Sequence, residues 1–400
     1  MNEWLIDTLA IVVILPVLGV LLWERVRHHD AWRSMVTPLA SIIGSGFLVV
    51  GPILAGVAGH WAVPAMIGLC ALAWLFGSAV RFNIAHAEPL HENEERKALR
   101  RLDRVAEACL ALAYFISVAY YLNLLGAFML KGIGIVNPLW ARWLTTAIIG
   151  GLGVLGWLRG FKGIEKAEIY AVTFKLAVIA GVIVALGAVA ISEFGHLSMP
   201  EANSSNSLWH DIRVLLGSVI LVQGFETARF LGRHYDAAQR VRSMRRAQLL
   251  ALVIYVAFVA LLLPHVSTEH TGMAKETQVI DIVQNVAWLL GPALVLAAVA
   301  SQLSAAIADM GGAGGLLDAM FERLSTRMAY AGITAAAIAM TWVTDIFGII
   351  ALASRAFAVY YGLQCLLAAI LAECRPLRRA YYVVGMLLAL VVVVFGAAAE

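Results

Sequence analysis

Charged side chains are scarce in this sequence, and their scarcity excludes an ordinary soluble domain. Only 14% of the 400 residues are Asp, Glu, Lys or Arg, whereas 62% are hydrophobic. Soluble domains average about 25% charged and about 45–50% apolar residues. The mean hydropathy is +0.84. Because the apolar excess extends along the whole chain, we expect an all-α polytopic membrane protein whose spans form one helical bundle.

The residues that enzymes and metal centres require are also few. The sequence contains no HExxH and no Gly-x-Ser-x-Gly motif, and its four cysteines follow no CxxC or Cys/His spacing. We interpret the cysteines as small core residues. The sequence therefore predicts no catalytic residues, no bound metal and no cofactor. The net charge is only +3, and no basic face is expected outside the membrane. The sequence therefore does not predict nucleic acid as a partner.

The chain begins with an apolar run, residues 4–23, that is not typical of a cleaved signal peptide. Acidic Glu3 and Asp7 stand where such a peptide carries basic residues, and no small-x-small cleavage site precedes Glu24. We predict a retained span here, the first of twelve. The predicted spans are residues 4–23, 37–59, 62–86, 105–130, 139–158, 167–192, 211–232, 248–265, 281–310, 328–345, 347–372 and 380–397.

Lys and Arg alternate between the loops in a way that predicts the topology. The loops on one side hold few basic residues, whereas the other side is rich in them. Because basic loops stay in the cytoplasm, we place both termini outside, in the plasma membrane that is the inner membrane of bacteria. The polar segment 193–210 is expected to be an external loop. The loops expected in the cytoplasm are 24–36, 81–104, 159–166, 233–246, 319–327 and 374–379.

Two of the predicted spans are weak at their centres. The first contains two glycines within residues 43–46, each unfavourable in a helix by about 1 kcal/mol relative to Ala. The second contains a glycine beside a carboxylate within residues 223–226. A break in lipid would leave backbone groups unpaired, so each break must face protein or a cavity. Helix N-termini there favour carboxylates, and open carbonyls favour cations. Close helix packing through small residues is the alternative explanation.

These two weak spans are the second and the seventh of the predicted set. They are five positions apart in the order of spans, and an odd difference means that the two spans cross the membrane in opposite directions. An inverted repeat of five plus five helices requires this arrangement. The expected organisation is an extra helix and loop in residues 1–35, a first repeat in 36–192, a second repeat in 193–372 and a C-terminal helix in 373–400. The predicted substrate site consists of Ile43, Gly44, Ser45, Gly46, Gln223, Gly224, Phe225 and Glu226.

Four stretches resemble the amino acid–polyamine–organocation (APC) superfamily of transporters. IIGSGFLVVGPILAGVAG (42–59) resembles its first core helix, and LVQGFETARF (221–230) resembles its sixth, with a G-F-E signature. GIEKAEIYAVTFKLAVI (163–179) and ASRAFAVYYGLQCLLAAI (352–369) resemble its fifth and tenth core helices. The resemblance covers about residues 36–372. It implies the LeuT-type fold, in which the first and sixth core helices are broken around the substrate.

The resemblance also implies coupling or gating roles for five side chains. In sodium-coupled relatives a bound ion bridges the first and eighth core helices, and in relatives similar to this chain a fifth-helix lysine takes that place. Lys175 would tie these helices together; a structural lysine bonded to carbonyls is the alternative. Ser301 and Ser304 would face the break unless they bond to their own helix. Glu226 would be a gate or proton acceptor and Arg229 would close the cytoplasmic side, although their spacing also fits an ion pair.

The sequence also gives expectations for other polar side chains in the predicted spans. Asp309 is expected near the cytoplasmic interface, and Arg355 is expected to pair with a carboxylate in the bundle. The third core helix carries three tyrosines, Tyr114, Tyr120 and Tyr121. Either one of them caps a substrate pocket or all three contribute to helix packing.

The expectations together predict a secondary transporter rather than an enzyme. Its cargo would be a small amino acid or a related amine, whose carboxylate binds the ends of the broken helices. Transport would be coupled to protons or proceed by exchange. The alternatives are a transporter of the same fold for an inorganic ion or another organic solute, and a receptor or accessory protein that transports nothing.

Overall fold

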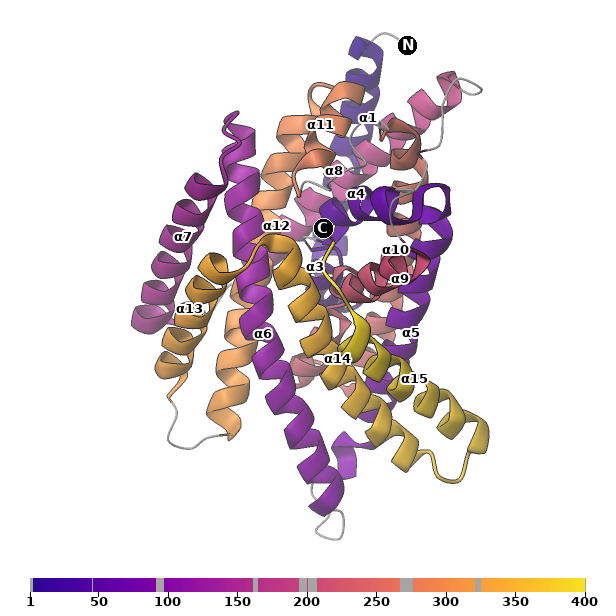
Figure 1. The fold of residues 1–400 in the computed structure, drawn as a ribbon, viewed down its shortest axis with the longest axis vertical. Coiled ribbons are helices and arrows are strands. Elements are labelled where there is room, and N and C mark those ends of the chain that lie inside the picture. The colour runs from indigo at the N-terminus through magenta and orange to yellow at the C-terminus, as the bar shows by residue number, and fades with distance from the viewer. Residues whose placement is uncertain are drawn as a thin grey trace.

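A computed structural model of the chain shows a bundle of helices, in agreement with the predicted fold class (Figure 1). It describes residues 3–44, 46–90, 97–160, 165–193, 200, 207–266, 276–320 and 325–399, and every regular element within them is a helix. The long helices are α1 (Glu3–Leu22), α5 (Ala62–His86), α6 (Lys97–Gly132), α7 (Pro138–Arg159), α8 (Glu165–Ser192), α10 (Ala237–Leu262), α12 (Leu290–Met320), α13 (Thr326–Val343), α14 (Ile346–Leu371) and α15 (Pro376–Phe395).

The two spans with weak centres are divided into shorter helices. These are α3 (Asp30–Ile42), α4 (Gly46–Ala58), α9 (Leu208–Gly217), η4 (Val219–Val222) and η5 (Phe225–Arg233). The remaining short helices connect the longer ones, and they are α2 (Glu24–Arg27), η1 (Gly59–Trp61), η2 (Glu88–Leu90), η6 (Leu263–His265) and α11 (Gln278–Val286).

Nine helical stretches of the described residues are long and apolar enough to cross a membrane. They correspond to nine of the twelve predicted spans, and one of them is a continuous stretch from α4 through α5. The other three predicted spans are the two divided ones and α13, a helix of 18 residues. The protein is therefore an integral membrane protein. The symmetry between its two predicted repeats stays a prediction.

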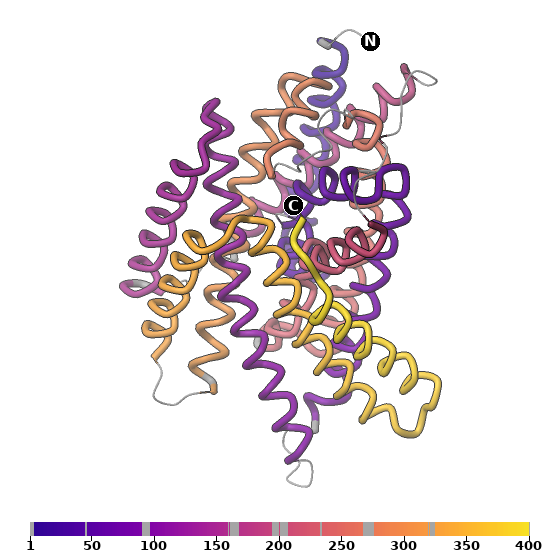
Figure 2. The backbone as a smooth tube through the Cα atoms, in the orientation of Figure 1, coloured from indigo at the N-terminus to yellow at the C-terminus, as the bar shows by residue number. Residues whose placement is uncertain are grey.

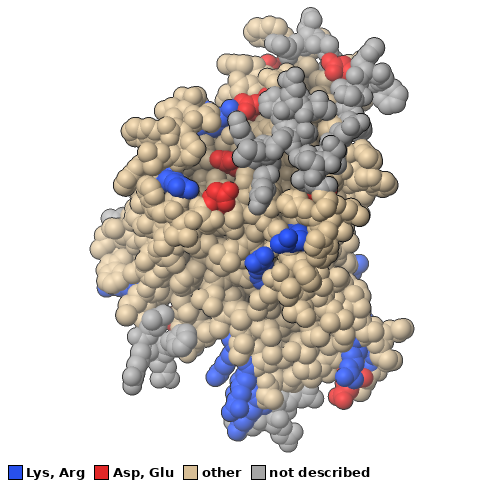
Figure 3. Space-filling model, viewed as in Figure 1, with Lys and Arg blue, Asp and Glu red and all other residues tan. Residues whose placement is uncertain are grey.

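The surface of the bundle fits a membrane environment. On the face shown in Figure 3 the middle zone carries few charged side chains, while Lys and Arg gather at the lower end. In the same orientation that end holds the start of α6 and the turn between α14 and α15 (Figure 1). The sequence predicts both regions to be cytoplasmic from their basic residues.

The divided helices lie between two groups of continuous helices (Figures 1 and 2). In one group α6 packs along α12 and α14, and α7 packs along α13; in the other α10 packs along α5. Helix α3 contacts α8, α10 and η5, so the first break is enclosed by protein. Behind it, Phe47 of α4 packs on Phe258 of α10 with ring centroids 4.0 Å apart. The bundle thereby holds irregular backbone away from lipid.

Helix α12 differs from its prediction at both ends. Residues 281–286 belong to α11, and α12 begins at Leu290 and continues to Met320. The prediction that this helix ends at residue 310 is wrong. The glycines beyond residue 310 continue the helix and allow it to pack closely against its neighbours. A Cβ at Gly312 would lie 3.2 Å from the ring of Tyr114. Asp309 is consequently about three turns inside the helix and 2% exposed, so its expected interfacial position is also wrong.

The segment after α15 folds back onto α9. Ala397 N–H donates to Arg213 O at 2.8 Å, and Gly217 approaches so closely that a Cβ there would lie 1.8 Å from Ala397 O. Arg355 of α14 donates through Nε to Gly396 O at 2.9 Å. The expectation that Arg355 pairs with a carboxylate is therefore wrong, since a backbone carbonyl is its partner.

Candidate functional site

The first break separates α3 from α4 inside the bundle. Ile43 leaves the helical conformation at φ −86° and ψ 47°, while its N–H still bonds to Leu39 O. The chain becomes helical again at Gly46. Ile43 and Gly44 are buried, so the freed backbone faces protein rather than lipid. Ser45, predicted to bind substrate, lies outside the described residues.

The second break lies directly against the first. Gly224 has φ 111°, in the left-handed region that favours glycine. A Cβ at Gly224 would lie 2.4 Å from Ser41 Oγ on α3, and a Cβ at Gly46 would lie 2.2 Å from Leu221 O on η4. Each glycine thus permits the close approach of the opposite divided helix. The structure brings the two predicted halves of the site together at these contacts.

Glu226 lies at the start of η5 and is fully buried. Its Oε2 accepts hydrogen bonds from Gly224 N–H at 3.1 Å and from the Tyr361 hydroxyl of α14 at 2.6 Å. Tyr361 in turn stacks on Phe225 with ring centroids 5.0 Å apart. One oxygen of the carboxylate is therefore held in place by the break itself and by the tenth core helix.

Two hydroxyl groups satisfy backbone groups that the breaks set free. The Tyr255 hydroxyl of α10 is within hydrogen-bond distance of two carbonyls, at 2.8 Å from Ile42 O and 2.6 Å from Leu221 O, and its single proton is shared between them. Ser354 of α14 donates to Gly217 O at 2.6 Å and accepts from Ile220 N–H at 2.9 Å. Side chains from continuous helices thus replace the missing helical bonds.

Replacing Tyr255 by phenylalanine is expected to destabilise the protein by about 1–3 kcal/mol. The change would leave two buried carbonyls without their donor, and each unmet group carries a desolvation cost. The midpoint of thermal unfolding of the purified protein measures the effect. Tyr381→Phe is the matched control because that side chain is exposed on α15. A Tyr255 variant as stable as the control would contradict the proposed contribution of this hydroxyl.

Lys175 of α8 joins three helices at the level of the first break. Its Nζ donates to Ala40 O on α3 at 3.1 Å and to Ser301 Oγ on α12 at 2.9 Å. The side chain is 4% exposed. The lysine therefore bridges the first and eighth core helices, as the resemblance implies. Ser304, one turn beyond Ser301, has a buried hydroxyl with no hydrogen-bond partner in the described part of the chain.

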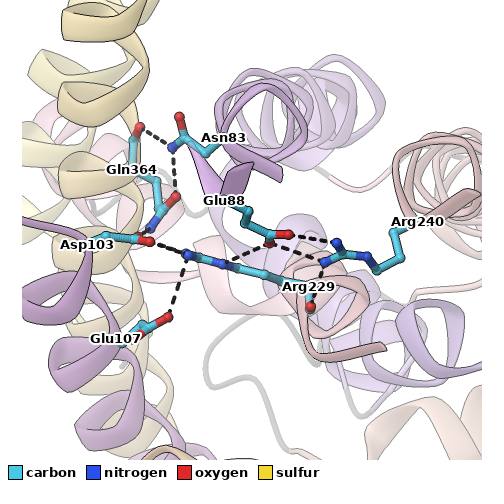
Figure 4. Close-up of polar contacts among 7 residues, drawn as sticks. All are labelled: Asn83, Glu88, Asp103, Glu107, Arg229, Arg240 and Gln364. Carbon is cyan, nitrogen blue, oxygen red and sulfur yellow. Dashed lines mark hydrogen bonds and ion pairs between the residues drawn. The ribbon is translucent and has the colours of Figure 1, made fainter. Parts of the chain in front are cut away.

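Arg229 of η5 lies in a buried polar network (Figure 4). Its guanidinium binds the Asp103 carboxylate through two hydrogen bonds, one of them 3.0 Å long between Nη1 and Oδ1. Its Nε is 3.5 Å from Glu88 Oε1, and Glu88 also pairs with Arg240 at 2.6 Å. Gln364 Nε2 donates to Asp103 Oδ1 at 3.1 Å. The network joins η2, α6, η5, α10 and α14.

The ion pair between Glu226 and Arg229 that their spacing allows is not what the structure shows. The guanidinium of Arg229 faces Asp103, Glu88 and Glu107, the last at 3.5 Å. Figure 4 shows these carboxylates around the guanidinium, on the side reached from α6 and η2. Glu226 therefore makes its hydrogen bonds at the second break, whereas Arg229 links η5 to η2 and α6.

Two cavities adjoin the divided helices. A polar one of about 270 Å³ lies between α3, α8 and the end of η5, with Arg33, Glu168 and His234 in its wall. An apolar one of about 560 Å³ lies between α5 and α10, with Ile42 and Tyr255 in its wall. The polar cavity therefore adjoins α3 on the side that faces α8.

Sequence reasoning missed several residues of this site. Tyr255 and Ser354 lie in apolar runs that predict ordinary spans, and Asp103 lies in a charged run that predicts a solvated helix. Local pattern gave no signal for any of the three, because their partners come from distant parts of the chain. Asp309 differs from these three residues, because a carboxylate inside an apolar run is itself a signal for a functional polar group.

Comparisons with known protein families and sequences give a match over most of the chain. A family model described as an APC superfamily transporter matches residues 24–396. An uncharacterized protein of Aquifex aeolicus (strain VF5) is 36% identical over 407 residues, in a match that covers 100% of this chain and 98% of that relative.

Solved structures with the same fold include two transporters. MhsT in complex with L-phenylalanine has a TM-score of 0.58 at 12% identity, over 90% of this chain and 97% of that one. A mutant of the manganese transporter of Eremococcus coleocola has a TM-score of 0.59 at 12% identity, over 90% of this chain and 86% of that one. Identities this low establish a LeuT-type fold and nothing finer.

Proposed function

The chain belongs to the APC superfamily of transporters, and from this premise we propose that it moves a small amino acid or a related amine by alternating access. We place it in the bacterial inner membrane, with transport coupled to protons or proceeding by exchange. The observation that carries the proposal is the contact between the two broken helices. Backbone groups freed at the breaks lie in the middle of a membrane-embedded bundle, which is where such folds bind their cargo.

Several details support an organic cargo with a carboxylate. The N-terminal end of α4 at Gly46 and the start of η5 at Phe225 both meet the breaks, and helix N-termini attract anionic groups. MhsT, which shares the fold, was solved with L-phenylalanine bound. Lys175 occupies the position between α3 and α12, which supports a mechanism without a bound sodium ion.

Transport of an inorganic cation is the second candidate, because a manganese transporter shares the fold. The side chains that could serve as metal ligands support this second candidate less well. In the described part of the chain no group of three His, Cys, Asp or Glu side chains is arranged to hold a metal ion. Metal sites for hard divalent cations use six or more oxygen ligands, several of them carboxylates.

Flux through the purified protein in proteoliposomes tests the proposal. Uptake of a radiolabelled amino acid or amine, driven by a proton gradient or by counter-substrate inside the vesicles, is the expected result. A protein that moves no amino acid, amine or inorganic ion under either condition would be a receptor or accessory protein, and the proposal would be wrong.

Replacing Lys175 by alanine is expected to change the pH dependence of transport. The lysine is proposed to exchange its proton while it links α3 to α12, so its loss would flatten the response of uptake rate to external pH. Initial rates over a range of pH, for wild type and variant, measure the effect. Lys131→Ala is the matched control, because that lysine pairs with Asp281 at 2.6 Å away from the breaks. An unchanged profile in the Lys175 variant would remove the residue from coupling.

A further inference from the structure

The apolar cavity of about 560 Å³ has no role in the proposed transport function. It lies between α5, α10 and the start of α15, on the side of the bundle opposite α7 (Figure 1). Three of the side chains that line it, Ile67, Leu249 and Tyr381, are exposed on the surface of the bundle. Because α5, α10 and α15 are membrane spans, the cavity opens toward the bilayer. Its volume is in the range of about 300–1,000 Å³ that is usual for cavities that hold small molecules.

A buried arginine lies at the edge of this cavity. Arg81 of α5 is 8% exposed, and its guanidinium carbon is 4.5 Å from the ring centroid of Trp74, which lines the cavity. Its Nη1 donates a hydrogen bond to Oε1 of Gln248, a second lining residue. Gln248 is itself held by a hydrogen bond of 2.9 Å from its Nε2 to Ala73 O. The positive charge is therefore fixed in place beside an apolar space.

The protein does not balance this charge within the part of the chain that the structure describes. No carboxylate there forms an ion pair with Arg81. A second arginine, Arg245 of α10, has its guanidinium carbon 6.0 Å from the centroid of the same Trp74 ring. Arg245 is exposed and has no carboxylate partner among the same residues. A buried charge without a counterion is costly, and a like charge nearby adds repulsion. The two arginines therefore favour an anion at this end of the cavity.

The cavity and the two arginines together suit an amphiphile with an apolar tail and an anionic head. Both arginines belong to segments, 81–104 and 233–246, that the sequence predicts to lie on one side of the membrane. Basic pockets between membrane helices bind the headgroups of anionic lipids, and guanidinium groups bind phosphate through paired hydrogen bonds. A free phosphate ion would satisfy the arginines and leave the apolar cavity unexplained. A phospholipid satisfies both.

We propose that the cavity binds an acyl chain of an anionic phospholipid of the bilayer, whose phosphate is bound by Arg81 and Arg245. The inference goes beyond the proposed transport function and does not depend on the cargo. The inner wall of the cavity includes Ile42 and Tyr255. The Tyr255 hydroxyl bonds there to carbonyls of both divided helices. An acyl chain in the cavity therefore contacts the side chains that join the two breaks, and its binding stabilises this packing.

Lipid binding to the purified full-length protein in detergent tests the proposal. The probes are dioleoyl phosphatidylglycerol, which is anionic, and dioleoyl phosphatidylcholine, which has the same acyl chains and no net charge. Native mass spectrometry during a titration gives the number of bound lipids and their affinity. We expect phosphatidylglycerol to bind at least about tenfold more tightly than phosphatidylcholine, because only its headgroup leaves a net charge to balance the arginines. Equal affinities would overturn the proposal. Inorganic phosphate that competes as well as the anionic lipid would also overturn it, because the acyl chain would then contribute nothing.

Substitution of the exposed arginine tests the site of the headgroup. Arg245→Gln is expected to weaken binding of phosphatidylglycerol at least about fivefold and to leave phosphatidylcholine within about twofold. Arg242→Gln is the matched control, because Arg242 is exposed on the same helix and does not line the cavity. Arg81→Gln is expected to have a larger effect. If the Arg81 variant fails to fold, Arg245→Gln still decides, and an affinity equal to that of the control would contradict the proposed headgroup site.

Filling the cavity tests the site of the acyl chain without changing any charge. Ala71 of α5 lines the cavity and is exposed, so a phenylalanine there occupies the space from the bilayer side. Ala71→Phe is expected to weaken binding of phosphatidylglycerol at least about tenfold. The matched control is Ala147→Phe, at an exposed alanine of α7 on the opposite side of the bundle (Figure 1). Binding by the Ala71 variant as tight as by this control would show that the acyl chain lies elsewhere, and the proposed site would be wrong.

Discussion

Replacing Gly46 by alanine is expected to abolish transport and to destabilise the protein by about 1–3 kcal/mol or more. The added Cβ would lie 2.2 Å from Leu221 O and 2.6 Å from Leu221 Cα. Both are backbone atoms, so no side chain can rotate away to relieve the overlap. The two divided helices would have to separate at the point where the site is formed. Uptake in proteoliposomes and the midpoint of thermal unfolding measure the two effects.

Glycines that meet no neighbour provide the controls for this experiment. A Cβ at Gly150 of α7 or at Gly311 of α12 would have no other atom within 4 Å. Alanine at either position is expected to leave transport intact and to be neutral or slightly stabilising, because alanine is the better helix former by about 1 kcal/mol. Normal transport by the Gly46 variant would show that the site tolerates separation of the breaks, contrary to the geometry.

Replacing Arg229 by methionine is expected to destabilise the protein by about 3–5 kcal/mol, the usual cost of removing one partner of a buried ion pair. Asp103 would then be a buried carboxylate without the arginine that pairs with it, although Gln364 Nε2 would still donate to its Oδ1. Glu88 would keep Arg240. Thermal unfolding of the purified protein measures the loss.

A second substitution separates stability from function in this network. Replacing both members of a buried pair by apolar residues is often nearly neutral. The double variant Arg229→Met, Asp103→Leu is therefore expected to recover much of the lost stability. Its transport rate is expected to stay low, because the polar connection between η5 and α6 is still missing. The control Arg242→Gln changes an exposed arginine of α10 and is expected to fall within about 0.5 kcal/mol of wild type. An Arg229 variant no less stable than this control would contradict the importance of the pair.

The positions of both breaks could be predicted because their signals are local. Glycines at 44, 46 and 224 interrupt apolar runs, and the carboxylate at 226 marks the second run as special. The fold class and nine of the twelve predicted spans followed from the length of the apolar runs. These properties depend on neighbouring residues in the chain and on the thickness of the bilayer.

The groups that complete the site could not be predicted, since they come from distant parts of the chain. Tyr255 is 213 residues from Ile42, and Ser354 is 137 residues from Gly217. Asp103 is 126 residues from Arg229, and its charged surroundings in sequence indicate solvent, whereas in the structure it is 1% exposed. Asp309 was misplaced because the glycines after it resemble a loop, while they in fact let α12 pass close to Tyr114.

The contact between α9 and the segment after α15 has a consequence for the order of folding. Arg213 Nε donates to Phe395 O at 3.2 Å, and the two residues are 182 positions apart. At about 5–20 residues per second, a ribosome needs roughly 10–40 s to synthesise the chain between them. During that time α9 is already made but lacks the partner that covers Gly217. Helix α9, the first part of the second divided helix, can therefore reach its final place only after α15 has been synthesised, which makes assembly of the proposed substrate site a late event in folding.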